Sequence, residues 1–301
     1  MQRLHSTCPG QKLLTIVVLC LTGLWGCNRA NTQKVDETPA TGDSQTTDNV
    51  NSGSSDAVVC AFFGLDNALP LRANALAKGA FGKDGMPVNF KDEIDGSTLD
   101  AEDFLVIDRN GKQHIPIAAT LKPADHEGEN RTVLLIGEFG NDGTNPPVEV
   151  KIVGDLHTKN KHKDASAPSV AKNLKGDSTK NVIPLSDGPR MFFAQIVKGD
   201  LAEQKNNHSQ AVQVAWQGGI TPVDTKVAEA DLFRFYTVYA DDNGKLIPLT
   251  PKSIADINDN DNYHLLVVET ALPIVKVSMR AGVVKDPNGD PNPDTEVMVE
   301  R

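Results

Sequence analysis

Two stretches near the C-terminal end of the chain place carboxylate and amide side chains at alternate positions. A hard cation such as calcium takes about six to eight oxygen ligands, so this spacing predicts calcium binding. The larger candidate site consists of Asp286, Asn288, Asp290, Asn292, Asp294 and Glu296. The smaller candidate site consists of Asp256, Asn258, Asn260 and Asp261.

A second interpretation of the same stretches needs no ligand. Asp and Asn accept left-handed backbone conformations and hydrogen-bond their own backbone, so they are also common turn residues. Neither stretch fits the EF-hand loop, because Asp261 stands where that loop requires glycine and Gly289 comes too early in the other. Calcium binding and turn formation both remain open at this point.

The sequence contains little that indicates catalysis. The histidines beyond the leader are His114, His126, His157, His162, His208 and His264. They lie outside the common motifs of serine hydrolases, zinc proteases and phosphate loops. A pair of carboxylates such as Glu93 and Asp95 could hydrolyse a glycoside, but the sequence does not show which carboxylates approach each other. We therefore expect no catalysis, with a hydrolytic or accessory envelope enzyme using the acidic loops as the alternative.

The first residues of the chain have the order of a secretory signal. Arg3 and Lys12 precede an uncharged apolar run from Leu13 to Leu24, and a small residue precedes Cys27. A membrane-spanning helix needs about 20 apolar residues, which is longer than this run. Residues 1–26 are therefore predicted to be a signal peptide that is removed on export.

The end of this leader, Leu24-Trp25-Gly26-Cys27, resembles the signal of bacterial lipoproteins. The resemblance implies that Cys27 is lipidated and becomes the first residue of the mature chain. Trp25 departs from the family pattern, in which a small residue usually precedes the glycine. Asn28 follows the cysteine where aspartate would imply retention at the inner membrane. A lipid anchor in the outer membrane or at the cell surface is the expected location.

Residues 27–56 are predicted to form a disordered tether. From Asn28 to Asp56 the chain has no aromatic residue, leucine or isoleucine, so it cannot bury enough apolar surface to offset the entropy of ordering. The formal net charge of the whole chain is −10, and loss of Arg3 and Lys12 leaves 28 basic and 40 acidic residues. This charge argues against nucleic acid as a partner.

The region beyond residue 56 has the pattern of an all-β protein. Short apolar runs are bounded by Gly, Asn, Asp or Pro, and Asn110-Gly111 between two runs predicts a hairpin whose central residues have positive φ. Cys60 lies in the apolar run 58–63, which predicts a buried strand position for the thiol. Trp216 and the tyrosines also lie within such runs, where packing in the core or on a sheet is expected.

The second part of this region repeats the first at an offset near 130 residues. Residues 104–112 recur as 236–245, with one additional residue, and both copies continue into an Ile-Pro pair. Residues 134–138 match 265–269 in the same order. This periodicity predicts two copies of one domain, at 57–156 and 187–301, joined by a linker or long loop at 157–186.

Met86 to Phe104 resembles the opening of the bacterial Ig-like domains found in S-layer and other surface proteins. The shared features are a strand ending at Phe90, the segment Asp95-Gly96-Ser97-Thr98-Leu99, and a new strand that begins at Phe104. The resemblance implies antiparallel β-sandwiches, and the second copy follows from the repeat.

Together these observations predict a lipid-anchored protein of the bacterial envelope with two Ig-like β-sandwiches. We expect a structural, adhesive or ligand-binding role, toward an envelope polymer or protein that the sequence does not identify. No cofactor is expected unless the acidic loops bind calcium, in which case a calcium-dependent carbohydrate-binding module is a further alternative.

Overall fold

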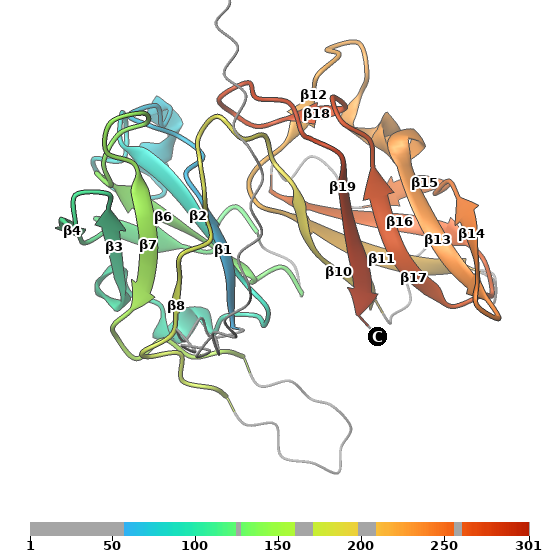
Figure 1. The fold of residues 1–301 in the computed structure, drawn as a ribbon, viewed down its shortest axis with the longest axis horizontal. Helices are drawn as coiled ribbons and strands as arrows, with labels where there is room; N and C mark the ends of the chain where they lie inside the picture. Colours follow the sequence, from blue (N-terminus) through green and yellow to red (C-terminus); the bar gives the residue numbers. More distant parts are fainter. Residues whose placement is uncertain (1–56, 125–127, 160–170, 198–208, 256–260, 301) are drawn as a thin grey trace, which may run out of the picture. The chain divides into compact units, whose positions relative to one another are not determined.

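The computed structural model describes residues 57–124, 128–159, 171–197, 209–255 and 261–300. Residues 51–301 form one compact unit. The fold is all-β, as predicted, with strands joined by turns and short 3-10 helices (Figure 1). Within the described residues, no helix has the length and apolar character needed to cross a membrane.

Strands β1 to β9, which we call the first half, form two sheets (Figure 1). One sheet has the order β5-β6-β2-β1-β9 and the other has the order β4-β3-β7-β8. The strands are β1 (Val58–Phe62), β2 (Asp84–Phe90), β3 (Phe104–Asp108), β4 (Gln113–His114), β5 (Ala118–Thr120), β6 (Thr132–Gly137), β7 (Pro147–Ile152), β8 (Ser178–Thr179) and β9 (Val182–Ile183).

Strands β10 to β19 form the second half. Its main strands have the order β14-β13-β17-β19-β10-β11-β16-β15, which we treat as two sheets, β14-β13-β17-β19 and β19-β10-β11-β16-β15, that share β19. Strand β12 pairs separately with β18. The strands are β10 (Met191–Val197), β11 (Ser209–Trp216), β12 (Thr221–Pro222), β13 (Tyr236–Asp242), β14 (Lys245–Leu249), β15 (Ser253–Ala255), β16 (Tyr263–Glu269), β17 (Ile274–Met279), β18 (Val284–Lys285) and β19 (Thr295–Glu300).

Every strand pairing of the first half has a counterpart in the second half, whereas the pair β12–β18 has none in the first. The order β5-β6-β2-β1-β9 is matched by β15-β16-β11-β10-β19, and β4-β3-β7-β8 is matched by β14-β13-β17-β19. Even the irregularities coincide, because β1–β2 and β10–β11 each shift register after the first pair. The pairs β3–β7 and β13–β17 each shift register between their last two pairs.

The last strand of each half connects both sheets of that half. In the second half, β19 pairs antiparallel with β17 and then parallel with β10. In the first half this role is divided, since β8 pairs antiparallel with β7 and β9 pairs parallel with β1. Part of the predicted linker 157–186 is therefore a pair of short strands that complete the first half, and residues 160–170 lie outside the described residues.

This difference from the predicted linker has a physical reason. Strands of two residues are too short to show an alternating pattern, and the surrounding lysines suggested a solvated connection. Lys172 and Lys175 instead form ion pairs with Asp177 and Asp155, at 3.1 Å and 3.3 Å. The segment is held by backbone pairing to distant strands, which composition does not reveal.

The described part of the chain contains four 3-10 helices. They are η1 (Leu71–Ala75), η2 (Gly96–Thr98), η3 (Ala101–Asp103) and η4 (Glu229–Phe235). The carboxylates of Asp95 and Asp100 accept hydrogen bonds from the first backbone N–H groups of η2 and η3. Helices η3 and η4 end directly before β3 and β13, which is a further correspondence between the halves.

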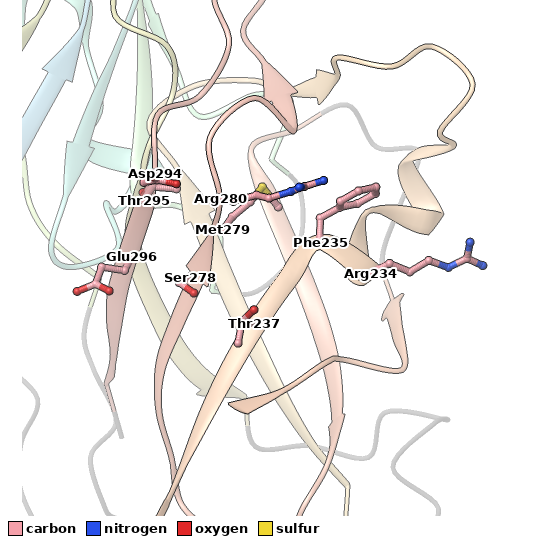
Figure 2. Close-up of a pocket in the computed structure, with 9 residues that line it drawn as sticks. All are labelled: Arg234, Phe235, Thr237, Ser278, Met279, Arg280, Asp294, Thr295 and Glu296. Atoms are coloured by element: carbon pink, nitrogen blue, oxygen red, sulfur yellow. The ribbon is translucent and has the colours of Figure 1, made fainter. Parts of the chain in front are cut away.

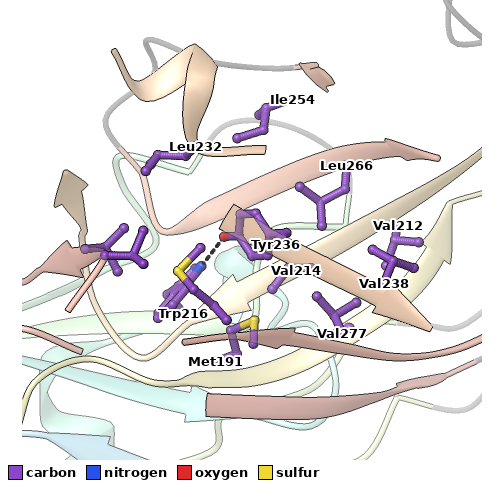
Figure 3. Packing of buried hydrophobic residues seen from close by; sticks show 14 of the residues in the cluster. Met191, Val212, Val214, Trp216, Leu232, Tyr236, Val238, Ile254, Leu266 and Val277 are labelled. Atoms are coloured by element: carbon purple, nitrogen blue, oxygen red, sulfur yellow. Dashed lines mark hydrogen bonds between the residues drawn. The ribbon is translucent and has the colours of Figure 1, made fainter. Parts of the chain in front are cut away.

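Each half packs residues from both of its sheets into one apolar core. The first core includes Val88 of β2 and Val106 of β3, and both are fully buried. The second core includes Val214 of β11 and Val238 of β13, also fully buried (Figure 3). Side chains of opposing strands thus fill a common interior, which is the usual way in which two sheets are stabilised.

The remaining face of the β2 sheet contacts the second half through buried polar groups. Asn89 donates a hydrogen bond to the Gln217 carbonyl at 3.2 Å, and the Arg131 N–H donates to the Tyr263 hydroxyl at 3.0 Å. Cys60 is buried there, as predicted, and burial raises the pKa of its thiol to about 11. The two halves are therefore joined by specific hydrogen bonds within one compact unit.

The predicted hairpin at Asn110-Gly111 is present between β3 and β4, with a geometry different from the expected one. Gly111 has a φ of 80°, and its N–H donates to the Asp108 carbonyl. Its counterpart between β13 and β14 has positive φ at both Asn243 (52°) and Gly244 (89°). The expected turn with two positive φ values therefore occurs in the second copy.

Candidate functional site

The larger predicted calcium site begins at Asp286, which closes a turn with its own carboxylate. Its Oδ1 accepts hydrogen bonds from the N–H groups of Gly289 at 2.8 Å and Asp290 at 2.9 Å. Only 2% of Asp286 is exposed, and this burial raises the pKa of its carboxyl group. Asn288 donates to the Asp290 carboxylate at 2.6 Å. These contacts are those of a turn.

The remaining members of this candidate site bind separate partners. Asn292 accepts hydrogen bonds from the N–H groups of Val283 and Val284, each at 2.9 Å. Asp294 accepts from the Ala281 N–H at 2.8 Å, and Glu296 pairs with Lys276 at 2.9 Å. Among the described residues, no three His, Cys, Asp or Glu side chains form a group suited to a metal ion.

Several predicted residues lie outside the described part of the chain. These are the lipidation candidate Cys27 and three members of the smaller acidic cluster, Asp256, Asn258 and Asn260. The fourth member, Asp261, is buried and accepts a hydrogen bond from the Tyr263 N–H at 2.7 Å. Asp261 thus stabilises the start of β16.

The structure shows an apolar cleft that the sequence did not predict. It has a volume of about 760 Å³ and is formed mainly by η1 and by strands β1, β2 and β6 of the first half. Gly218, Gly219, Thr221 and Pro287 of the second half line its other side. Most of its walls are Leu, Ala, Pro and Gly, and Arg72 is the charged side chain among its lining residues.

A second depression lies on the outer face of β13, β17 and β19, and we call it the polar groove (Figure 2). Its volume is about 650 Å³, and its floor carries Thr237, Ser278 and Glu296. Arg280 lies 5.9 Å from the ring of Phe235, and Arg234 pairs with Asp231 at 3.0 Å. Figure 2 shows both guanidinium groups directed away from the strands. The groove mixes positive, negative and hydroxyl groups.

Sequence reasoning missed both depressions for the same reason. Their walls come from segments that are more than 100 residues apart in the cleft and more than 40 apart in the groove, as their lining residues show. Each lining residue alone is an ordinary surface or strand residue. A possible signal was the glycine pair at 218–219, directly after a strand-like run.

A buried hydrogen-bonded network occupies the core of the second half. The indole N–H of Trp216 donates to the Tyr236 hydroxyl at 2.8 Å (Figure 3). This hydroxyl lies 2.8 Å from Nδ1 of His264. Nε2 of His264 lies 3.7 Å from the Glu229 carboxylate. The sequence predicted packing in the core or on a sheet for Trp216 and Tyr236, and both lie in the core, where they are at most 1% exposed.

A second buried histidine network lies in the first half. Asp108 is 1% exposed, and its Oδ2 lies 2.9 Å from Nε2 of His114 and 2.6 Å from the amide nitrogen of Asn145. Its Oδ1 accepts from the N–H groups of Asn110 and Lys112. Burial alone would raise the pKa of Asp108, but these hydrogen bonds outweigh it and lower the pKa to about 2. Asp108 therefore holds the β3–β4 hairpin as a carboxylate.

No family model matches the chain, and no curated protein matches it.

Proposed function

We propose that this protein is a bacterial envelope lipoprotein that presents two Ig-like β-sandwich domains and binds a ligand or partner without catalysing a reaction. Its lipid is attached at Cys27, and residues 28–56 act as the tether. The lipid anchors the protein in the outer membrane or at the cell surface.

The observation that carries this proposal is the strand order that occurs twice. In both halves the last strand pairs with both sheets, and the register shifts occur at matching positions. An antiparallel arrangement of two packed sheets of about this size is the architecture of Ig-like domains, which commonly serve as spacers or binding modules. The apolar cleft supports the binding role, because ligand sites often lie where two structural modules meet.

Metabolic labelling tests the anchor. A bacterial host that expresses the full-length gene is supplied with radioactive palmitate, and the labelled protein is compared among wild type, Cys27→Ser and Cys8→Ser. We expect label in the wild type and in Cys8→Ser, because Cys8 lies within the predicted leader. Loss of label in Cys27→Ser alone supports lipidation. Equal labelling of Cys27→Ser contradicts it.

A second experiment tests the non-catalytic role. The protein is incubated with generic ester and glycoside substrates, and in parallel with purified envelope polymers in a sedimentation assay. We expect co-sedimentation with at least one polymer and no turnover. Turnover that is lost on substitution of Asp290 or Asp294 would favour the alternative of a hydrolytic enzyme that uses the acidic loop.

A further inference from the structure

We infer that the apolar cleft binds a single-chain anionic amphiphile, such as a long-chain fatty acid, with the hydrocarbon chain inside the cleft and the carboxylate beside Arg72. This inference deepens the ligand-binding role proposed above and rests on it. Three features of the cleft support it, namely apolar walls, open space beside the glycines and the positive charge of Arg72.

The walls of the cleft suit a hydrocarbon chain. Leu65 and Leu134 are partly exposed to the cleft, and Phe62 and Leu69 form buried parts of its wall. A volume of about 760 Å³ lies within the range of about 300–1,000 Å³ that is typical of small-molecule sites. A hydrocarbon chain in the cleft would cover these apolar walls, and the free energy of binding would gain in proportion to the apolar area removed from water.

Glycines keep the cleft open on the side of the second half. A Cβ atom at Gly219 would have no heavy atom within 4 Å, so the space beside this residue is empty. A Cβ atom at Gly218 would lie 3.1 Å from the ring of Phe62 and 3.6 Å from Pro87. Larger side chains at these two positions would therefore occupy the volume that the ligand needs.

The rim combines exposed apolar side chains with one positive charge. Leu76 lines the cleft and is 41% exposed, and Leu71, which precedes Arg72 in η1, is 68% exposed. Arg72 lies between them in the sequence and lines the cleft. Arg72 is the charged side chain among the residues that line the cleft, and a guanidinium binds a carboxylate through two parallel hydrogen bonds.

The concave shape favours a single chain over a bilayer surface. A flat membrane would contact exposed side chains such as those of Leu71 and Leu76, but it would not reach the less exposed Leu134 on β6 or the buried Gly85 on β2. These strand residues line the same cleft, so the apolar surface continues inward from the rim. An inserted chain covers both parts, and its head remains in water beside Arg72.

Titration calorimetry with three dodecyl amphiphiles tests the inference. The gene is expressed from Asn28 onward, without the predicted leader and Cys27, so that the protein carries no lipid and can be purified without detergent. Each ligand is kept below its micelle concentration. Laurate, dodecyltrimethylammonium and dodecyl maltoside share one chain and differ in head charge. We expect laurate to bind most tightly and the cation most weakly. Decanoate should bind about fifteenfold more weakly than laurate, because it lacks two methylenes and each buried methylene changes the affinity by about fourfold.

Matched variants locate the binding site. Gly219→Leu fills the cleft and should weaken laurate binding at least about tenfold, whereas Thr225→Leu adds the same side chain at an exposed position outside it. Arg72→Glu should weaken laurate binding and leave dodecyl maltoside unchanged. Lys78→Glu makes the same charge change outside the cleft and serves as its control. If Gly219→Leu does not fold, Ala75→Trp fills the cleft from η1 instead.

The outcomes separate the inference from the proposed function. Absence of laurate binding overturns the inference. Equal affinities for the three amphiphiles, unchanged in the Gly219→Leu variant, also overturn it. Sedimentation with anionic phosphatidylglycerol vesicles, unaffected by Gly219→Leu, would show a surface contact with lipid and would also contradict it. None of these results bears on lipidation of Cys27 or on polymer binding, which are measured separately.

Discussion

The cores of the two halves have the same strand pairings and different chemistry. Phe90 pairs with Val58 at the register shift of the first half, and Trp216 pairs with Met191 at the same point of the second. By the same matching of registers, Phe104 corresponds to Tyr236 and Val133 to His264. Three apolar side chains in one core thus correspond to a hydrogen-bonded set in the other.

The polar residues of the second core depend on one another for their hydrogen bonds. The Trp216 N–H can only donate, so the Tyr236 oxygen accepts from it. The Tyr236 hydrogen is then satisfied by Nδ1 of His264, which leaves the proton of the neutral imidazole on Nε2, facing Glu229. Substitution of one member leaves another buried polar group without a hydrogen-bond partner. Substitution of an apolar core residue removes only the contacts of that residue.

The largest expected effect comes from removal of the central hydroxyl. Tyr236→Phe deprives the buried Trp216 N–H and His264 Nδ1 of their partner, and each such group costs about 1–3 kcal/mol. We expect the free energy of unfolding in urea to fall by about 2–4 kcal/mol. The change is followed by circular dichroism.

Phe104→Leu is the matched control for this prediction. It alters the corresponding apolar position, where the cost arises from lost packing and should be about 1 kcal/mol. A smaller loss of stability for Tyr236→Phe than for Phe104→Leu would mean that the hydrogen-bonded network contributes little to the second core.

An intermediate effect is expected from acid at the hairpin of the first half. The folded pKa of Asp108 is about 2 and its unfolded value is 3.8, so its contribution to stability is complete above the unfolded value. It is lost as the pH falls from about 4 to about 2. The unfolding midpoint of wild type should therefore approach that of Asp108→Asn over this pH range. The corresponding residue of the second half, Ala240, cannot titrate.

The control for this pH dependence is Asp242→Asn, an exposed carboxylate at the second hairpin. Its difference from wild type should remain small at every pH. If the difference between wild type and Asp108→Asn were constant from neutral pH to pH 2, then Asp108 would not be the titrating group.

A smaller effect should distinguish the two hairpins. Asn243 has a φ of 52°, a conformation that costs a residue with a simple Cβ about 1 kcal/mol. Asn243→Ala should therefore lower stability by about 0.5–1 kcal/mol, and Asn110→Ala should lower it by less, because the first hairpin uses positive φ at Gly111. Equal losses in urea denaturation would show that the two turns do not differ in this way.

The smallest effect is expected from calcium. The carboxylates of Asp286 and Asp294 already accept backbone N–H groups, so the loop has its geometry without an ion. Melting temperatures with a chelator and with about 1 mM calcium should agree within about 1 °C. A rise of several degrees that Asp290→Asn removes would establish the calcium site predicted from the sequence, with Asp142→Asn as a control at another acidic turn.

Much of the strand content could be predicted from the sequence, because side chains alternate between the interior and the surface of a sheet. Cys60 and Trp216 were predicted to lie in strands because each belongs to a short apolar run, and both are buried. The acidic loop was harder to interpret, since the same residue types bind calcium and form turns. The choice depends on where each oxygen points, as Asp286 and Asn292 show.

The sequence by itself determined the all-β class and the repeated order of strand-forming segments, because both depend on local patterns of apolar residues. Only the tertiary structure decided that residues 178–183 complete the sheets of the first half, that Trp216, Tyr236 and His264 meet, and that an apolar cleft opens beside η1. These features join residues that are distant in the chain, and such contacts depend on the packing of whole sheets.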